Sequence, residues 1–144
     1  MTTDELNVKH LEMIQAVVSR LAGNSFSIKG WSITLVSALF ALAAKDANKT
    51  YAFLALLPAL CFWGLDAYYL RQERLFRKLY EALRPFATIT IQEPGKQLFS
   101  MRTGCVAHLV KPWFCTLFSP TIVCLHGPIL VAIAIVMKYA SAAK

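Results

Sequence analysis

The sequence lacks the motifs by which most enzymes are recognised. It contains no recognisable set of nucleophile, base and orienting residue, and no glycine-rich loop of the kind that cradles phosphates. Cysteines occur only at positions 61, 105, 115 and 124, and their spacing predicts neither a disulfide framework nor a paired metal knuckle. Cys105 and His108 share one helical face, but two ligands do not make a zinc site. We therefore expect no enzymatic activity, no cofactor and no metal.

Acidic residues are also scarce, and no targeting signal is visible. The first 12 residues are polar and mildly acidic, without the short apolar core of a signal peptide. Only 8 acidic residues stand against 15 lysines and arginines, which gives a formal net charge of +7. By contrast, 57% of the 144 residues are hydrophobic, and they occur in blocks. With a mean hydropathy of +0.51, this composition predicts an integral membrane protein.

The apolar blocks predict a mainly α-helical protein with three transmembrane helices. No charged residue occurs from Gly30 to Ala44, and flanking lysines can extend this stretch to the length of a span. The second block contains Pro58, which predicts a kink that neighbouring helices accommodate. Residues 112–137 carry no Lys, Arg, Asp or Glu, and prolines divide this run into residues 112–118, which are either interfacial or re-entrant, and a third span. The predicted spans are residues 28–46, 51–70 and 119–139.

An amphipathic helix is expected before the first span, within residues 1–27. Apolar residues recur there at three- and four-residue steps from Leu6 to Leu21, and Gly23-Asn24-Ser25 is expected to end the helix. The apolar stripe alone does not identify the surface against which the helix packs. It either packs on the rest of the protein, lies on the membrane, or serves as an oligomerisation helix.

The connection between the second and third spans, residues 71–111, is basic. Leucines at 75, 79 and 83 lie on one stripe and Pro85 follows, which predicts a helix over residues 71–84. Residues 88–92 then alternate polar and apolar, Pro94-Gly95 suits a turn, and residues 97–101 would return, which predicts a β-hairpin over residues 86–102. Because a lone hairpin is marginally stable in water, we expect it to dock on the helix or to pair with other subunits.

The distribution of lysine and arginine predicts the orientation in the membrane. The turn between the first two spans holds two basic residues, Lys45 and Lys49. The long connection holds many more: Arg71, Arg74, Arg77, Lys78, Arg84, Lys96, Arg102 and Lys111. The positive-inside rule therefore places the N-terminus and this connection in the cytoplasm.

Asp66 is the strongest candidate for a functional residue within a span. Apart from Asp46, at the very end of the first span, it is the only acid in a predicted span, and intramembrane acids tend to be functional. Lys29 enters the first span at the level where Asp66 leaves the second. The two residues form either a structural pair or part of a pore or gate, and we place Asn24 in the same candidate gate. His126 is either a proton relay or pore residue or, as is more common, a residue that hydrogen-bonds across helices.

The basic connection is the strongest signal outside the membrane. Basic residues interleaved with aromatic ones can bind a phosphate backbone and stack bases. The same charges also fit the positive-inside rule and attraction to anionic lipid, and the sequence alone does not separate lipid from nucleic acid. The candidates for phosphate contacts are Arg74, Lys78, Arg84, Lys96 and Arg102, and those for base stacking are Tyr80, Phe86 and Phe99.

Distinctive stretches occur within residues 5–84. They are Met13 to Arg20, Asn24-Ser25-Phe26, Lys29-Gly30-Trp31, Phe40 to Lys45, and Trp63 to Tyr80. Together these stretches resemble small bacterial inner-membrane proteins of anti-phage defence loci, in particular the membrane effectors of the Hailong system. The remainder of the chain shows no such resemblance.

The resemblance implies an ion-channel effector assembled from several subunits, expected to be four. A partner nucleotidyltransferase would make single-stranded DNA oligomers that bind the effector and hold it closed. Infection would remove this restraint, and the open channel would depolarise the cell and arrest growth. The residues themselves leave two alternatives: a non-channel membrane scaffold that binds anionic lipid or a partner protein, and a holin-like protein or small transporter.

Overall fold

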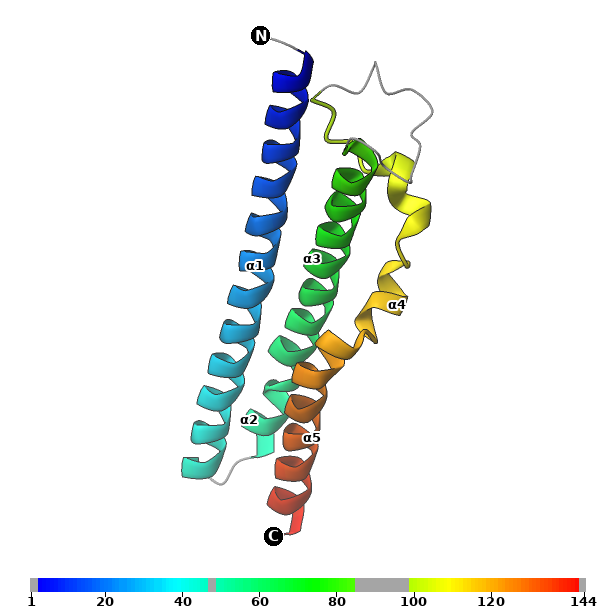
Figure 1. The fold of residues 1–144 in the computed structure, drawn as a ribbon. Coiled ribbons are helices and arrows are strands. Elements are labelled where there is room, and N and C mark those ends of the chain that lie inside the picture. Colours follow the sequence, from blue (N-terminus) through cyan, green and yellow to red (C-terminus); the bar gives the residue numbers. More distant parts are fainter. Residues whose placement is uncertain (1–2, 47–48, 85–98, 143–144) are drawn as a thin grey trace. The chain divides into compact units, whose positions relative to one another are not determined.

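The computed structural model describes residues 3–46, 49–84 and 99–142, and it is helical. The described residues contain three stretches that are long and apolar enough to cross a membrane: Asp4–Lys45, Thr50–Leu83 and Pro120–Lys138. This agrees with the predicted multi-pass helical architecture. The elements in chain order are α1 (Thr3–Asp46), α2 (Lys49–Leu54), α3 (Leu56–Leu83), the 3-10 helix η2 (Gly104–Leu109), α4 (Trp113–Leu117) and α5 (Pro120–Ala142) (Figure 1).

The chain divides into two compact units. The first unit comprises residues 1–24 and 69–112, and the second comprises residues 25–68 and 113–144. Helices α1 and α3 each begin in one unit and end in the other, so both contribute residues to both units.

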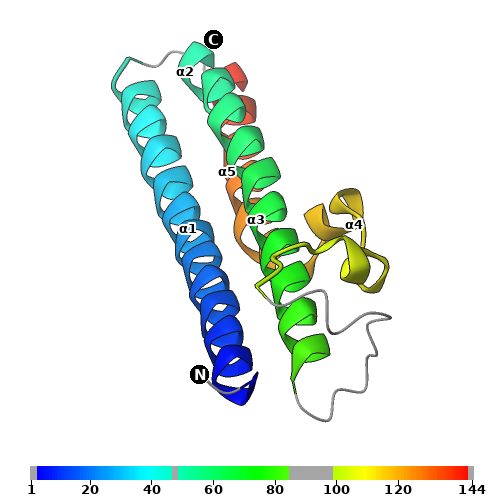
Figure 2. The ribbon, with the colours of Figure 1, turned by 90° about the horizontal axis from the view of Figure 1, so that it is seen from above.

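Helix α1 is continuous, which corrects the predicted break at Gly23-Asn24-Ser25. It runs for 44 residues without interruption, as Figure 2 shows for the blue-to-cyan ribbon. A glycine in a helix costs about 1 kcal/mol relative to alanine, which packing on either side can offset. Ile14 is buried in the first unit and Val36 in the second. Ser25 lies inside this helix, and its hydroxyl donates to the Asp66 carboxylate on α3.

The core of the second unit is built largely from small residues. Val36, Ala55, Ala59 and Ile133 form a buried cluster, and larger side chains pack around it. Alanines on the α2–α3 side let α5 approach closely, since small residues at an interface let helix backbones come near one another. Helices α2 and α5 are indeed in contact.

The outside of the second unit is apolar, whereas several polar side chains are buried. Phe53 and Leu57 are each 65% exposed, and Trp31 and Val131 are also largely exposed. Ser25, Ser32, Asp66, Thr116, Ser119 and His126 are buried instead. An apolar exterior of this kind suits lipid, and it leaves the interior as the place where polar groups find partners.

A short interruption at Ala55 separates α2 from α3, and Pro58 in the first turn of α3 accounts for it. The helical assignment stops at Leu54 and resumes at Leu56, with a turn at Ala55 between them. Backbone bonds from Ala55 to Tyr51 and from Ala59 to Ala55 continue across the turn. Proline has no N–H to offer the carbonyl of Leu54, which accounts for the interruption one turn before it.

The first unit is organised around a second buried cluster. Ile14 of α1, Leu79 of α3 and Val106 of η2 are its buried members. Because Val106 is buried in this cluster, η2 is anchored against α1 and α3. The expected helix after Arg71 is present, as the last part of α3, which ends at Leu83.

The predicted β-hairpin over residues 86–102 is not supported. Residues 85–98 lie outside the described part of the chain, and residues 99–102 contain no strand. Phe99, placed in the predicted returning strand, has a φ of 62°. This left-handed conformation is incompatible with extended backbone, which requires a strongly negative φ.

Candidate functional site

A buried polar cluster joins three helices of the second unit. It consists of Ser25 and Lys29 from α1, Asp66 from α3 and His126 from α5, and we call it the Asp66 cluster. Ser25 and Lys29 are four residues apart, so both lie on one face of α1. Asp66 is fully buried and His126 is 1% exposed, in helices whose outer faces are apolar.

Each carboxylate oxygen of Asp66 has at least one donor. Oδ1 accepts a hydrogen bond from the Ser25 hydroxyl at 2.6 Å and from Lys29 Nζ at 2.6 Å. Lys29 also donates to Ser25 Oγ at 2.6 Å, which closes a triangle of three polar groups. Nε2 of His126 lies 3.3 Å from Oδ2. The charge is thereby paired within the cluster, as a buried charge must be.

His126 is positioned by an aromatic neighbour. Its ring stacks on Trp63 of α3, with centroids 6.3 Å apart and planes 8° from parallel. Trp63 is itself fixed by a hydrogen bond from Nε1 to the carbonyl of Leu117, at 2.9 Å. With Nε2 facing a carboxylate, the neutral imidazole donates from Nε2 and keeps an acceptor at Nδ1. That Nδ1 atom is buried and has no partner among the described residues.

The structure brings some of the candidate gate residues together and leaves one of them apart. The pair expected between Lys29 and Asp66 forms, and His126 hydrogen-bonds across helices, which was the preferred interpretation for that residue. Asn24 is exposed on α1 and is not a member of the Asp66 cluster. Ser25 was expected only as part of the helix end at Gly23-Asn24-Ser25, although its four-residue spacing from Lys29 places both residues on the same face of a continuous helix.

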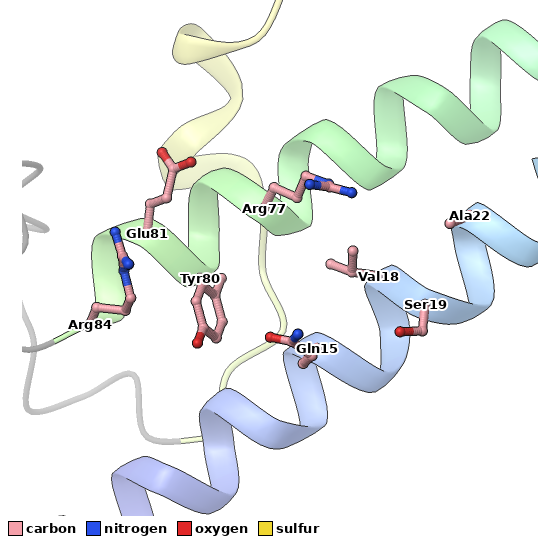
Figure 3. A pocket seen from close by; sticks show the side chains of 8 residues that line it. All are labelled: Gln15, Val18, Ser19, Ala22, Arg77, Tyr80, Glu81 and Arg84. Atoms are coloured by element: carbon pink, nitrogen blue, oxygen red, sulfur yellow. The ribbon is translucent and has the colours of Figure 1, made fainter.

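A hollow of about 380 Å³ lies between α1 and α3 in the first unit. Figure 3 shows the Tyr80 ring directed toward Gln15, with the Arg84 side chain beside the ring. The Cζ atom of Arg84 is 5.9 Å from the ring centroid, within the range of a cation–π interaction. We call this site the Tyr80 hollow. It is lined by Gln15, Val18, Ser19, Ala22, Arg77, Tyr80, Glu81 and Arg84.

The charges around the Tyr80 hollow are only partly neutralised. Arg77 pairs with Glu73 at 2.7 Å, and Glu81 pairs with Lys78 at 2.6 Å. Both ion pairs are formed along α3 itself, which leaves the exposed Arg84 guanidinium to face solvent beside Tyr80. The hollow therefore offers a cation, an aromatic face and the polar side chains of Gln15 and Ser19, of which sequence reasoning had selected only Tyr80 and Arg84.

The other predicted ligand residues do not all converge on this hollow. Arg74 and Lys78 lie on α3 but line a different hollow, with Lys111. Arg102 is exposed, and Phe99 places its ring 5.8 Å from that of His10. Lys96 and Phe86 lie outside the described residues. Arg77, which was not selected, lines both hollows.

The remaining chemistry is sparse. In the described parts of the chain, no group of three or more His, Cys, Asp or Glu residues is placed to hold a metal ion. The four cysteines are free and exposed. Comparison of the chain with protein-family models, with curated proteins and with solved structures finds no match.

Proposed function

We propose that this protein is an oligomeric ion-channel effector of the bacterial inner membrane that responds to a nucleic-acid ligand. The observation that carries the proposal is the Asp66 cluster, which brings ionisable side chains from three apolar helices together in a buried site. Ionisable groups at such positions are costly, and they mark ion pathways and gates more often than they serve stability. In the proposal this cluster is the gate: Asp66 and His126, buried within each subunit, hold Lys29, which reaches the surface, and the cluster rearranges when the channel opens.

Packing in the second unit favours a pore between subunits over a pore through one subunit. The apolar cluster of Val36, Ala55, Ala59 and Ile133 occupies the interior between its helices. An ion path therefore requires several copies, and we propose four, with the N-terminus in the cytoplasm. This number and orientation follow from the resemblance and from the basic connection.

Helix α3 supplies a route from ligand to gate. It is a single helix that contains Asp66 and, about four turns later, Tyr80, and Arg84 directly follows its last residue, Leu83. A base stacked on Tyr80 and a phosphate on Arg84 would bias the position of this helix. In the proposal, single-stranded DNA oligomers made by a partner nucleotidyltransferase hold the channel closed, and their loss opens it, depolarising the cell and arresting growth.

The test is ion flux from vesicles that contain the purified protein. We expect potassium release in the absence of oligonucleotide and suppressed release when a single-stranded DNA oligomer is present on the side of the basic connection. An Asp66→Asn variant should change the open fraction in the absence of oligonucleotide, and the apparent oligonucleotide affinity should shift with it, because the oligomer favours the closed state. Vesicles that stay tight with and without the oligomer would contradict the channel and favour the membrane-scaffold alternative.

A further inference from the structure

A second hollow in the first unit has a different chemical character from the Tyr80 hollow. Its volume is about 250 Å³, and we call it the Lys111 hollow. Four basic side chains and one acidic side chain line it, so cations are in excess, and the rest of the lining is aliphatic. Its lining residues are Arg74, Arg77, Lys78, Glu81, Leu109, Val110 and Lys111.

The Lys111 hollow is assembled from two distant parts of the chain. Arg74, Arg77 and Lys78 are three and four residues apart, so they lie together on one face of α3. Lys111 follows η2 and is held beside α3, because Nε of Arg71 donates to the Lys111 carbonyl at 3.4 Å. Since Lys78 and Arg77 are engaged with glutamates of α3, the exposed Lys111 contributes to the excess positive charge.

The aliphatic part of the lining selects among phosphate ligands. Leu109 is 41% exposed and lies with Val110 beside the cations. A free phosphate gains nothing from such a wall, whereas the glycerol and ester region of a phospholipid does. A nucleotide base binds best where it can stack on an aromatic ring. The Lys111 hollow is lined by no aromatic residue, whereas the Tyr80 hollow offers the ring of Tyr80.

The positions of the lining residues along the chain favour a lipid. Arg71 and Arg74 directly follow the apolar part of α3, and Lys111 is the last charged residue before the uncharged run of residues 112–137. The residues on both sides of the hollow therefore lie at the ends of apolar segments, where the first charged residues occur. Anionic headgroups are concentrated at this level of a membrane.

We propose that the Lys111 hollow binds the phosphate headgroup of an anionic phospholipid. The ammonium of Lys111 and the guanidinium of Arg74 contact the phosphate, and Leu109 and Val110 contact the glycerol region. This site differs from the proposed oligonucleotide site, although Arg77 and Glu81 line both hollows. Occupancy by lipid does not require that the protein is a channel.

The test measures lipid retained by the purified protein after exchange into detergent with phosphatidylglycerol or phosphatidylcholine, using native mass spectrometry. We expect selective retention of phosphatidylglycerol, weakened about fivefold by Lys111→Gln and about 25-fold by the charge reversal Lys111→Glu. Lys111 is exposed, so neither change should prevent folding. Arg102→Gln is the matched control, because it removes an exposed basic charge of the same unit outside the hollow.

A soluble competitor separates a lipid site from a general phosphate site. Glycerophosphoglycerol carries the same phosphodiester headgroup without acyl chains, and we expect it to displace phosphatidylglycerol only weakly. Displacement at equal concentration would show a site for a soluble phosphodiester and overturn the lipid assignment. Equal retention of both lipids, or equal loss in the Arg102→Gln control, would overturn the site itself.

Discussion

Lys29 and Asp66 form an ion pair in which only one partner reaches the surface. Nζ of Lys29 is 2.6 Å from Oδ1 of Asp66, and the exposed side-chain fractions are 28% for Lys29 and 0% for Asp66. The lysine can therefore turn toward headgroups or solvent if it loses its partner, as long basic side chains do at an interface. The Asp66 side chain is fully buried and cannot reach solvent in this way. Because of this asymmetry, we expect substitution of Lys29 and substitution of Asp66 to differ in their effect on stability.

We expect Lys29→Met to destabilise the protein more than Asp66→Asn. Lys29→Met leaves a buried carboxylate with Ser25 and His126 alone, and loss of one partner of a buried pair costs about 3–5 kcal/mol. Asp66→Asn removes the buried charge and leaves a lysine that can rotate outward. Unfolding of each variant in mixed detergent micelles measures the difference.

The double variant Lys29→Met/Asp66→Asn provides the control for this comparison. Because it removes both charges, it should be more stable than Lys29→Met alone, with a coupling energy of opposite sign to the single losses. If the two single variants were equally stable and their effects were additive, the ion pair would contribute nothing to the fold.

His126 should act through its Nε2 hydrogen bond and its stacking on Trp63. We expect His126→Leu to cost about 1–3 kcal/mol, because Oδ2 of Asp66 loses its donor in a buried site. His126→Gln retains a nitrogen donor and should lose much less. The measurement is again unfolding in micelles, and equal losses in the two variants would show that packing alone matters at this position.

The ion pair between Lys29 and Asp66 could be predicted from the sequence, because charged residues are rare in the apolar spans and these two lie at matching levels. An acid within an apolar span requires a partner, and Lys29 was the basic residue at the matching level of the neighbouring span. The participation of His126 could be argued only by frequency, since no sequence pattern says which helix faces which. The helical bounds after Arg71 followed from the leucine stripe.

Two of the expectations that the structure does not support share a physical cause. Gly23-Asn24-Ser25 is a fair stop signal for an isolated helix, but Ser25 is used by Asp66, 41 residues away in the sequence. Residues 97–101 were expected to form the returning strand of the hairpin, yet Phe99 adopts a left-handed conformation next to His10. In both cases a long-range contact overrides the local preference, and such contacts are not visible in a sequence pattern.

The close approach at the core of the second unit predicts intolerance to larger side chains. Ala59 is 2% exposed and packs with Val36 and Ile133. Ala59→Leu should cost about 1–3 kcal/mol through overpacking. Leu60→Ala is the neighbouring control: Leu60 is 53% exposed on the apolar exterior, and its truncation should change stability little. A larger loss at Leu60 than at Ala59 would contradict the observed packing.

The Tyr80 hollow predicts how oligonucleotide affinity depends on single side chains. Tyr80→Ala removes the stacking face and should weaken binding of a single-stranded DNA oligomer by about 1–3 kcal/mol. Tyr80→Phe keeps the ring and should bind nearly as well as the native protein. Fluorescence anisotropy of a labelled oligomer in detergent measures both affinities.

Arg84 should be detected by the salt dependence of the same binding. If its guanidinium contacts one phosphate, Arg84→Gln should make the plot of log affinity against log salt concentration less steep by about 0.7, which is the contribution of one phosphate contact on a single strand. Lys111→Gln removes an equal charge from the other hollow of the same unit and should leave the slope unchanged. Equal slopes in the native protein and Arg84→Gln would remove Arg84 from the ligand site, and an equal loss in both variants would indicate diffuse attraction to the whole basic unit.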